Sequence, residues 1–224
     1  MTIAGKRFET DDHILFRELD RQRIEYLYRI AKAQTVWQEV VPGIDSLALQ
    51  YDPASIDREE IERLIVELLT GDGQPEPNAS APETVTLPIC YAAEFGPDQA
   101  MIAERLGMTI GDLPEWHASR DWHVAMLGFL PGFAYLACDE DIPAIPRLAD
   151  PRARLAAGSV GLLGDQCGLY ALPGPGGWPI IGRVVTRLFD PHATPPALLR
   201  AGMCVRFQPL SRQEYDALTT GKRA

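Results

Sequence analysis

The sequence lacks the closely spaced cysteines and histidines that mark most metal and disulfide sites. The four cysteines lie far apart in the chain, at Cys90, Cys138, Cys167 and Cys204. This spacing fits neither a Cys-x-x-Cys motif nor a small disulfide scaffold. Of the histidines, His117 and His123 lie nearest to each other, at a spacing that matches no familiar zinc motif. We therefore expect reduced thiols and no metal site.

Long apolar runs and an excess of basic residues are also missing. No stretch approaches the roughly 18 apolar residues of a membrane helix, and residues 1–13 hold no run of signal-peptide length. The chain has 21 Lys and Arg against 31 Asp and Glu, a formal net charge of −10 and a pI of about 4.9. Such a charge repels nucleic acid and anionic membranes. We expect a cytoplasmic protein that binds neither nucleic acid nor membrane.

Two familiar catalytic signatures are absent as well. Ser159 lies in Ala-Gly-Ser-Val-Gly, which is not the Gly-x-Ser-x-Gly of a nucleophile elbow. The Gly-rich stretch 174–178 is not a Walker A loop, because no Lys-Ser/Thr follows it and Pro175 has no N–H to donate. Two interpretations of this stretch stay open: a tight turn between strands, or a loop whose backbone N–H groups approach an anion.

The composition is typical of a globular protein, with 46% hydrophobic and 23% charged residues. One segment, 71–83, departs from it, because it is rich in Pro, Gly and acidic residues and has no hydrophobic periodicity. Such a segment is typical of a linker. It predicts a first domain over 1–70 and a second over 84–212, followed by a tail over 213–224.

The first segment predicts a small α+β domain. Residues 14–16 and the stretches VWQEVVPG and SLALQYDP indicate strands. Apolar residues over 24–31 follow helical spacing, and a second helix begins after Asp57, carries an apolar stripe and ends at Gly71. We expect both helices on one face of a small sheet.

The second segment predicts a β-barrel or sandwich. A strand, VTLPICY, precedes two short helices, for which Asp98 and the pair of Thr109 with Asp112 are candidate capping residues. Short apolar runs separated by Gly and Pro follow, as in SVGLLG, GLYALP and WPIIGRVV. Runs of this length and spacing are typical of all-β domains.

Arginines and aromatic residues are the candidate binding groups of the second segment. Arg147, Arg152 and Arg154 lie close together in sequence, and Arg183 follows. A guanidinium binds carboxylate or phosphate with two parallel hydrogen bonds, although most arginines are simply solvated. The aromatic group lies in GFLPGFAYL: Phe129, Phe133 and Tyr135. These rings either stack on a flat ligand or belong to the core.

Several blocks of sequence together resemble one known family. They are EFGPD (94–98), GFLPGFAYL (128–136), IPR and DPRAR around residues 145–154, AAGSVGLLG (156–164), GLY (168–170), PGGW (175–178), IIGR (180–183) and LFD (188–190). Their order and spacing are similar to those of the family that includes the B subunit of 5-oxoprolinase, allophanate hydrolase subunit 1 and the kinase inhibitor KipI. FETDDHILF and VVPG extend the resemblance into the first domain, so that it covers roughly residues 8–210.

The resemblance implies a fold, a reaction and a partner. In that family an α+β domain precedes a cyclophilin-like β-barrel. The implied activity is ATP-dependent hydrolysis of a small amide or lactam, 5-oxoproline to glutamate in the first instance. ATP is the implied cofactor, and the implied partner is a larger, cyclophilin-like second subunit. We expect neither a metal nor a biotin site on this chain.

The resemblance also implies binding residues. Arg147, Arg154, Arg183 and the 175–178 loop are the implied holders of a phosphate or carboxylate. The other candidates for substrate or anion binding are Arg152, Ser159, Tyr170, Gly176, Gly177, Trp178, Phe129 and Phe133. No general base is indicated.

Some positions depart from the family pattern. Cys167, Gly174 and Val184 stand where the family has Thr, Ser and Thr, and Ala156 stands where it has Pro. If these positions border the pocket, three hydroxyls are missing there and the chemistry is altered. The alternative is that they face the barrel interior or solvent.

Two other functions stay open. One is a regulatory module like KipI, which inhibits a sensor histidine kinase without turnover. The other is a carboxyltransferase-type subunit in urea or allophanate metabolism. The latter requires biotin on another protein, because this chain has no Met-Lys-Met site.

Overall fold

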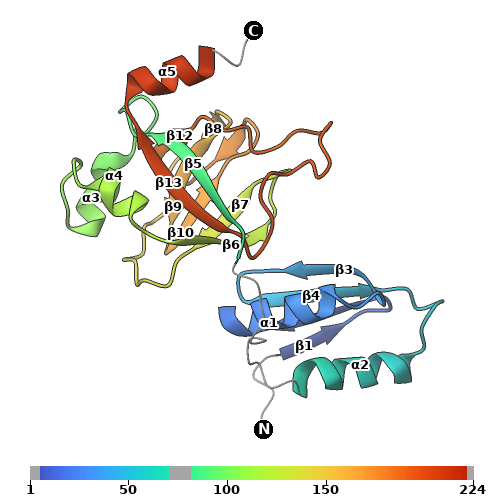
Figure 1. The fold of residues 1–224 in the computed structure, drawn as a ribbon. Helices are drawn as coiled ribbons and strands as arrows, with labels where there is room; N and C mark the ends of the chain where they lie inside the picture. The colour runs from blue at the N-terminus through green and yellow to red at the C-terminus, as the bar shows by residue number, and fades with distance from the viewer. Residues whose placement is uncertain (1–5, 71–81, 221–224) are drawn as a thin grey trace. The chain divides into compact units, whose positions relative to one another are not determined.

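The computed structural model describes residues 6–70 and 82–220, which belong to two compact units (Figure 1). The first unit spans residues 1–81 and the second spans 82–224. The predicted linker 71–83 lies outside the described residues, except for its last two positions. Within the described ranges, no helix combines the length and apolar character needed to cross a membrane.

The first unit is built on a four-stranded antiparallel sheet in the order β1-β2-β4-β3. Its strands are β1 (Lys6–Glu9), β2 (His13–Arg17), β3 (Trp37–Pro42) and β4 (Ser46–Tyr51). Because side chains alternate along a strand, Ile14 and Phe16 of β2 point to the same face as Leu47 and Leu49 of β4. These four side chains are almost fully buried.

Two helices, α1 (Arg21–Lys32) and α2 (Arg58–Thr70), cover that face (Figure 1). The Asp20 side chain accepts a hydrogen bond from the Arg23 amide at 2.7 Å, and Asp57 caps α2 through the Glu60 amide at 2.8 Å. Such caps satisfy backbone donors that a helix leaves unpaired in its first turn. The predicted α+β arrangement is confirmed.

The second unit is a closed seven-stranded barrel in the order β10-β7-β6-β13-β5-β12-β9, which confirms the predicted β-barrel. The barrel strands are β5 (Thr84–Cys90), β6 (Trp122–Leu127), β7 (Ala134–Ala137), β9 (Ser159–Leu163), β10 (Gln166–Leu169), β12 (Ile180–Val184) and β13 (Cys204–Leu210). Strands β8 (Arg152–Leu155) and β11 (Gly174–Gly176) form a separate two-stranded ribbon.

Three helices accompany the barrel: α3 (Gln99–Leu106), α4 (Leu113–Ala118) and α5 (Arg212–Thr220). Ile102 of α3 and Leu113 of α4 join the barrel core, whereas α5 follows β13 and lies apart from them (Figure 1). Many side chains of the core are 0–1% exposed, including Leu87, Trp122 and Val160. A core of this kind supplies most of the stabilising free energy.

Three details differ from what the sequence indicated. Asp98 precedes α3, but its side chain makes no capping hydrogen bond. The stretch 174–176 is not a turn between barrel strands; it is the strand β11, which pairs with β8. Residues 212–220 form helix α5, although no element was predicted within the tail.

Candidate ligand-binding site

Four aromatic side chains of the second unit gather on the outer side of the barrel. Leu136 of β7 points into the barrel core, so Phe133 and Tyr135 point the opposite way. The Phe133 ring packs edge to face against Tyr135, Tyr170 and Trp178, with centroids 4.8, 4.9 and 6.1 Å away. Such pairs fix the orientation of each ring, because the positive edge of one meets the negative face of another. We call these four residues the aromatic cluster.

Two glycines allow the rings to approach so closely. A Cβ atom at Gly168 would lie 2.8 Å from the Trp178 ring and 2.9 Å from the Phe133 ring. A Cβ atom at Gly176 would lie 2.4 Å from the Tyr170 hydroxyl. All three distances are shorter than real Cβ atoms show, so a side chain at either position would displace a ring. Gly176 therefore has a packing role, which the sequence alone did not separate from anion binding.

Tyr170 is held from two sides. The Trp178 backbone amide donates a hydrogen bond to its hydroxyl, and the Tyr170 amide donates to the Ser159 carbonyl at 3.0 Å. Burial raises the pKa of Tyr170, although the nearby charge of Arg147 opposes this rise. The phenol therefore stays protonated at neutral pH and has a proton to donate.

Phe129 extends the aromatic cluster to the surface. Its ring is edge to face with Phe133, at 5.5 Å, and the residue is 60% exposed. Its φ of +67° lies in the left-handed region that bulky residues avoid. Such strain persists only where surrounding contacts enforce it, and it concentrates at functional sites.

Arg147 borders the same group of residues. It is exposed and makes neither an ion pair nor a hydrogen bond with any residue in the described ranges. Burial raises the pKa of both Tyr135 and Tyr170, and the positive charge of Arg147 opposes this rise, so the guanidinium lies within electrostatic range of both hydroxyls. Arg147 therefore has hydrogen-bond donors available for an anion beside the aromatic cluster.

The other predicted arginines have different surroundings. Arg152 binds Asp98 with two parallel hydrogen bonds of 2.8 Å, so its forked donors already have a carboxylate. Arg154 is exposed on β8 and has no ion pair with a described residue. Of the four arginines that the sequence singled out, all of them in the described ranges, only Arg147 is brought to the aromatic cluster with its charge unpaired.

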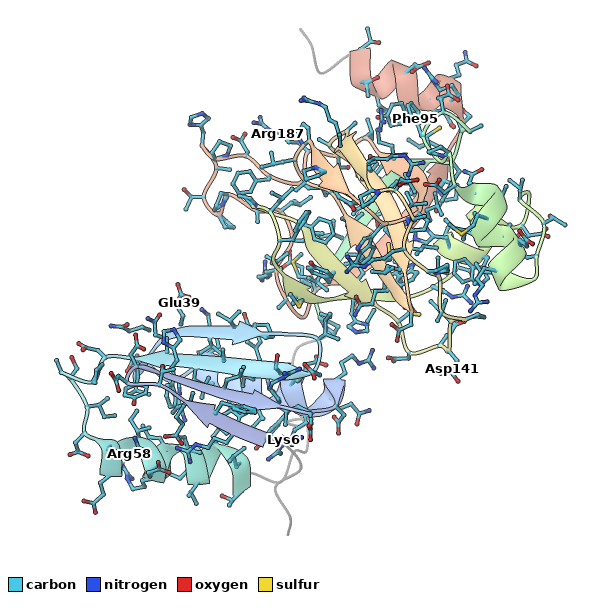
Figure 2. All side chains as sticks on the ribbon, turned by 180° about the vertical axis from the view of Figure 1, so that it is seen from behind. Lys6, Glu39, Arg58, Phe95, Asp141 and Arg187 are labelled. Carbon is cyan, nitrogen blue, oxygen red and sulfur yellow. The ribbon has the colours of Figure 1, made fainter. Side chains whose placement is uncertain are left out.

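Arg183 belongs to a separate group next to α5. Its guanidinium lies over the Phe95 ring at 4.6 Å and interacts with the Tyr215 hydroxyl. Figure 2 shows Phe95 beside α5, at one end of the second unit. The Arg183 Nε is buried and has no hydrogen-bond partner in the described part of the chain. Ser159 pairs with Arg183 in the barrel and is 2% exposed, so its side chain is closed to solvent.

Two of the departures from the family pattern lie in the barrel core, which favours the alternative that they face the barrel interior. Cys167 is 0% exposed and Val184 is 3% exposed, and both belong to the barrel core. Gly174 packs close to Leu130, since a Cβ atom there would lie 2.9 Å from the Leu130 Cδ1. At two of the three positions the side chain therefore faces the barrel interior, because barrel strands point alternate residues inward.

A buried polar chain in the barrel core was not predicted. The Tyr91 hydroxyl lies 2.7 Å from Nδ1 of His117, and Nε2 of His117 lies 3.5 Å from the Cys167 Sγ. Burial lowers the pKa of His117 to about 3 and raises the pKa of Cys167. A neutral ring and a protonated thiol follow, so this thiol is not an activated nucleophile. No sequence spacing could have joined these three residues.

The site is suited to binding a small, flat, anionic molecule. Phe133 and Tyr170 are 1% exposed and Trp178 is 7% exposed, so these rings form the buried support of the site. The exposed Phe129 ring and the half-buried Tyr135 provide surface for a ligand ring, and Arg147 provides a charge for a carboxylate. Among the described residues there is no group of three or more His, Cys, Asp or Glu side chains placed to hold a metal ion.

Comparison with known proteins places this chain in a family. The profile of the family described as carboxyltransferase domain, subdomain C and D, matches residues 11–199. The chain belongs to this family. Among its relatives, the B subunit of 5-oxoprolinase from Bacillus subtilis (strain 168) is 36% identical over 80% of this chain and 78% of its own length. The protein of the same name from Escherichia coli O157:H7 is 38% identical over 76% of this chain and 77% of its own.

A solved structure supports the same relationship. TTHA0988 is 32% identical and has a TM-score of 0.72 over 88% of this chain. This chain spans only 40% of the length of TTHA0988. The resemblance noted in the sequence is therefore confirmed at the level of the family.

Proposed function

We propose that this chain is one subunit of an ATP-dependent hydrolase that opens a small lactam, with 5-oxoproline as substrate and glutamate as product. The family supports the proposal, as do two relatives that carry the name of the 5-oxoprolinase B subunit. Because that name denotes one component of a complex, we infer a second, larger subunit as the partner. The observation that carries the proposal is the unpaired Arg147 beside the aromatic cluster.

The substrate's shape matches these residues. 5-Oxoproline has one nearly flat five-membered ring and one carboxylate. Arg147 binds the carboxylate, and the exposed Phe129 ring and the half-buried Tyr135 contact the lactam. In a chain with a net charge of −10, a local cation is needed to hold any anion. The chain's own residues thus orient the substrate and partly shield it from water.

ATP would activate the lactam carbonyl. The residues that are candidates for binding its phosphates are not equally well suited to this role. Arg183 has a buried Nε without a described partner, and Arg154 is exposed without an ion pair, so both fit an anionic group. The Gly-rich stretch fits less well, because Gly174 and Gly176 pair with β8 instead of forming an open loop. We infer that ATP is bound together with the partner subunit.

The complex provides the first test. The native chain is purified with its bound partner, and ATP hydrolysis is measured with 5-oxoproline, urea or allophanate. We expect hydrolysis that depends on 5-oxoproline and on both subunits. Hydrolysis that depends on urea or allophanate and not on 5-oxoproline would instead indicate a carboxyltransferase-type subunit. A complex that hydrolyses no ATP would favour a regulatory role.

Arg147 provides the second test. We expect Arg147→Gln to raise the KM for 5-oxoproline about tenfold or more, because a hydrogen bond to a charged group contributes about 1.5–3 kcal/mol. The matched control is Arg206→Gln, which removes an exposed guanidinium paired with Asp121. Both variants should keep the wild-type melting temperature. An unchanged KM in Arg147→Gln would show that Arg147 does not bind the substrate.

A further inference from the structure

Asp98 makes a concentrated set of hydrogen bonds outside the aromatic cluster. Its carboxylate accepts from Nη1 and Nη2 of Arg152, both at 2.8 Å, and from the Ile180 amide at 2.7 Å. The Asp98 side chain is 11% exposed. Bidentate, charge-assisted bonds of this kind have a defined geometry and little freedom. A carboxylate occupied by three donors is also poorly placed to accept a proton from a substrate.

The two partners of Asp98 lie on either side of Trp178. Arg152 begins β8, and its backbone pairs with Gly176 of β11, two residues before Trp178. Ile180 begins β12, two residues after Trp178. One carboxylate therefore holds both ends of the segment 176–180, which carries the tryptophan.

Asp98 itself is fixed firmly against β12. Its own amide donates to the Ile180 carbonyl at 3.1 Å. The neighbouring Gln99 side chain donates to the carbonyls of Ile181 and Tyr91 at 2.8 and 2.7 Å. Gly96 passes so close to β12 that a Cβ atom there would lie 2.2 Å from the Ile181 oxygen. The chain before α3 is thus a rigid support for the Asp98 carboxylate.

The position of Trp178 in turn determines how the rings of the aromatic cluster are arranged. Its ring contacts Phe133 and Tyr135, at 6.1 and 5.8 Å between centroids. Its backbone amide donates to the Tyr170 hydroxyl. A shift of the segment 176–180 would therefore move one ring and release the hydroxyl of another.

We propose that Asp98 is the positioning residue of the aromatic cluster: through Arg152 and the Ile180 amide it sets the place of Trp178, and through Trp178 that of Tyr170. Its effect on ligand affinity rests on the proposed function, whereas its effect on Trp178 does not. Arg152, which the sequence named as a candidate binding residue, then holds Asp98 in place and does not contact the substrate.

The test compares Asp98→Asn with Asp121→Asn in the full chain. Asp121 is also a carboxylate paired with an arginine of the second unit, but it is exposed and far less enclosed. Each variant is labelled with fluorotryptophan and studied by ¹⁹F NMR. Trp178→Phe identifies the Trp178 resonance among those of the four tryptophans. Binding of 5-oxoproline is titrated in parallel.

We expect Asp98→Asn to shift or broaden the Trp178 resonance while that of Trp122, in the barrel core, stays in place. The affinity for 5-oxoproline should fall at least fivefold, and Asp121→Asn should change neither property. Arg152→Lys keeps the charge and the Ile180 bond but loses the bidentate geometry, so an intermediate shift is expected.

Other outcomes would separate the two proposals. An unchanged Trp178 resonance in Asp98→Asn would overturn the positioning role. In a further outcome, all tryptophan resonances move together in both Asp98→Asn and Arg152→Lys. Asp98 would then contribute only to general stability, and the positioning role would be overturned as well. If the wild type binds no 5-oxoproline but the Trp178 resonance still responds to Asp98→Asn, the positioning role stands and the proposed substrate falls.

Discussion

At the scale of single residues, the buried imidazole of His117 couples stability to pH. Its pKa is lowered to about 3, first by burial and then by the charge of Arg120. In the unfolded chain a histidine has a pKa near 6.5. Between these values the unfolded state binds a proton that the folded state does not. Stability is therefore complete above about pH 6.5 and falls as the pH drops toward 3.

The difference in the pKa of His117 between the folded and unfolded states predicts how the stability of His117→Gln depends on pH. Gln keeps a hydrogen-bonding side chain that does not titrate. Between pH 7 and pH 5, we expect the wild type to lose about 2 kcal/mol more free energy of unfolding than the variant. Urea denaturation followed by tryptophan fluorescence measures this at each pH. His192→Gln, at an exposed histidine, is the control and should follow the wild type. Parallel pH profiles for wild type and His117→Gln would contradict the prediction.

At the scale of elements, α5 is attached to the second unit through a small apolar cluster in which the Phe95 ring is central. Tyr215 of α5 packs against it at 4.6 Å between centroids. The guanidinium groups of Arg183 and Arg212 lie over the same ring, at 4.6 and 4.8 Å. Arg212 also forms an ion pair with Glu94. Since exposed ion pairs contribute little, the ring contacts dominate the attachment.

We therefore expect Phe95→Leu to release α5 while the barrel stays folded. The loss of one aromatic pair and two cation–π contacts should cost about 1–3 kcal/mol. Hydrogen exchange over residues 212–220 should accelerate about tenfold, because local opening becomes easier. Phe8→Leu, at a phenylalanine that is 50% exposed in the first unit, is the control. Equal protection of α5 in Phe95→Leu and wild type would show that other contacts hold the helix.

At the scale of the whole molecule, each unit has a hydrophobic core made from its own residues. The core of the first unit runs from Ile14 to Leu69 in sequence, and that of the barrel runs from Leu87 to Phe207. We propose that these are two independently folding domains with their boundary in the segment 71–83.

The fragment 82–224 tests this proposal. Because its core is complete, we expect it to unfold cooperatively with a melting temperature within a few degrees of the barrel transition in the full chain. Calorimetry of both proteins measures the transitions. A fragment that lacks cooperative unfolding would show that the barrel depends on the first unit for stability.

Local patterns in the sequence determined most of the elements. Asp57 and the apolar stripe after it predicted α2, because capping and helical spacing involve residues within a few positions of each other. The alternation of Leu47 and Leu49 predicted a half-buried strand for the same reason. The Pro-rich segment 71–83 indicated the division, and the separate sequence blocks indicated the family.

Only the tertiary structure decided which side chains meet. Arg152 and Asp98 are 54 residues apart in sequence, and His117 and Cys167 are 50 apart. Such pairs depend on how the barrel closes and on the register of its strands. Periodicity shows which face of a strand a residue occupies, but not which residue lies opposite. The sequence thus named both Arg147 and Arg152 as candidates. In the fold, Arg147 has no ion pair with a described residue, whereas Arg152 binds Asp98.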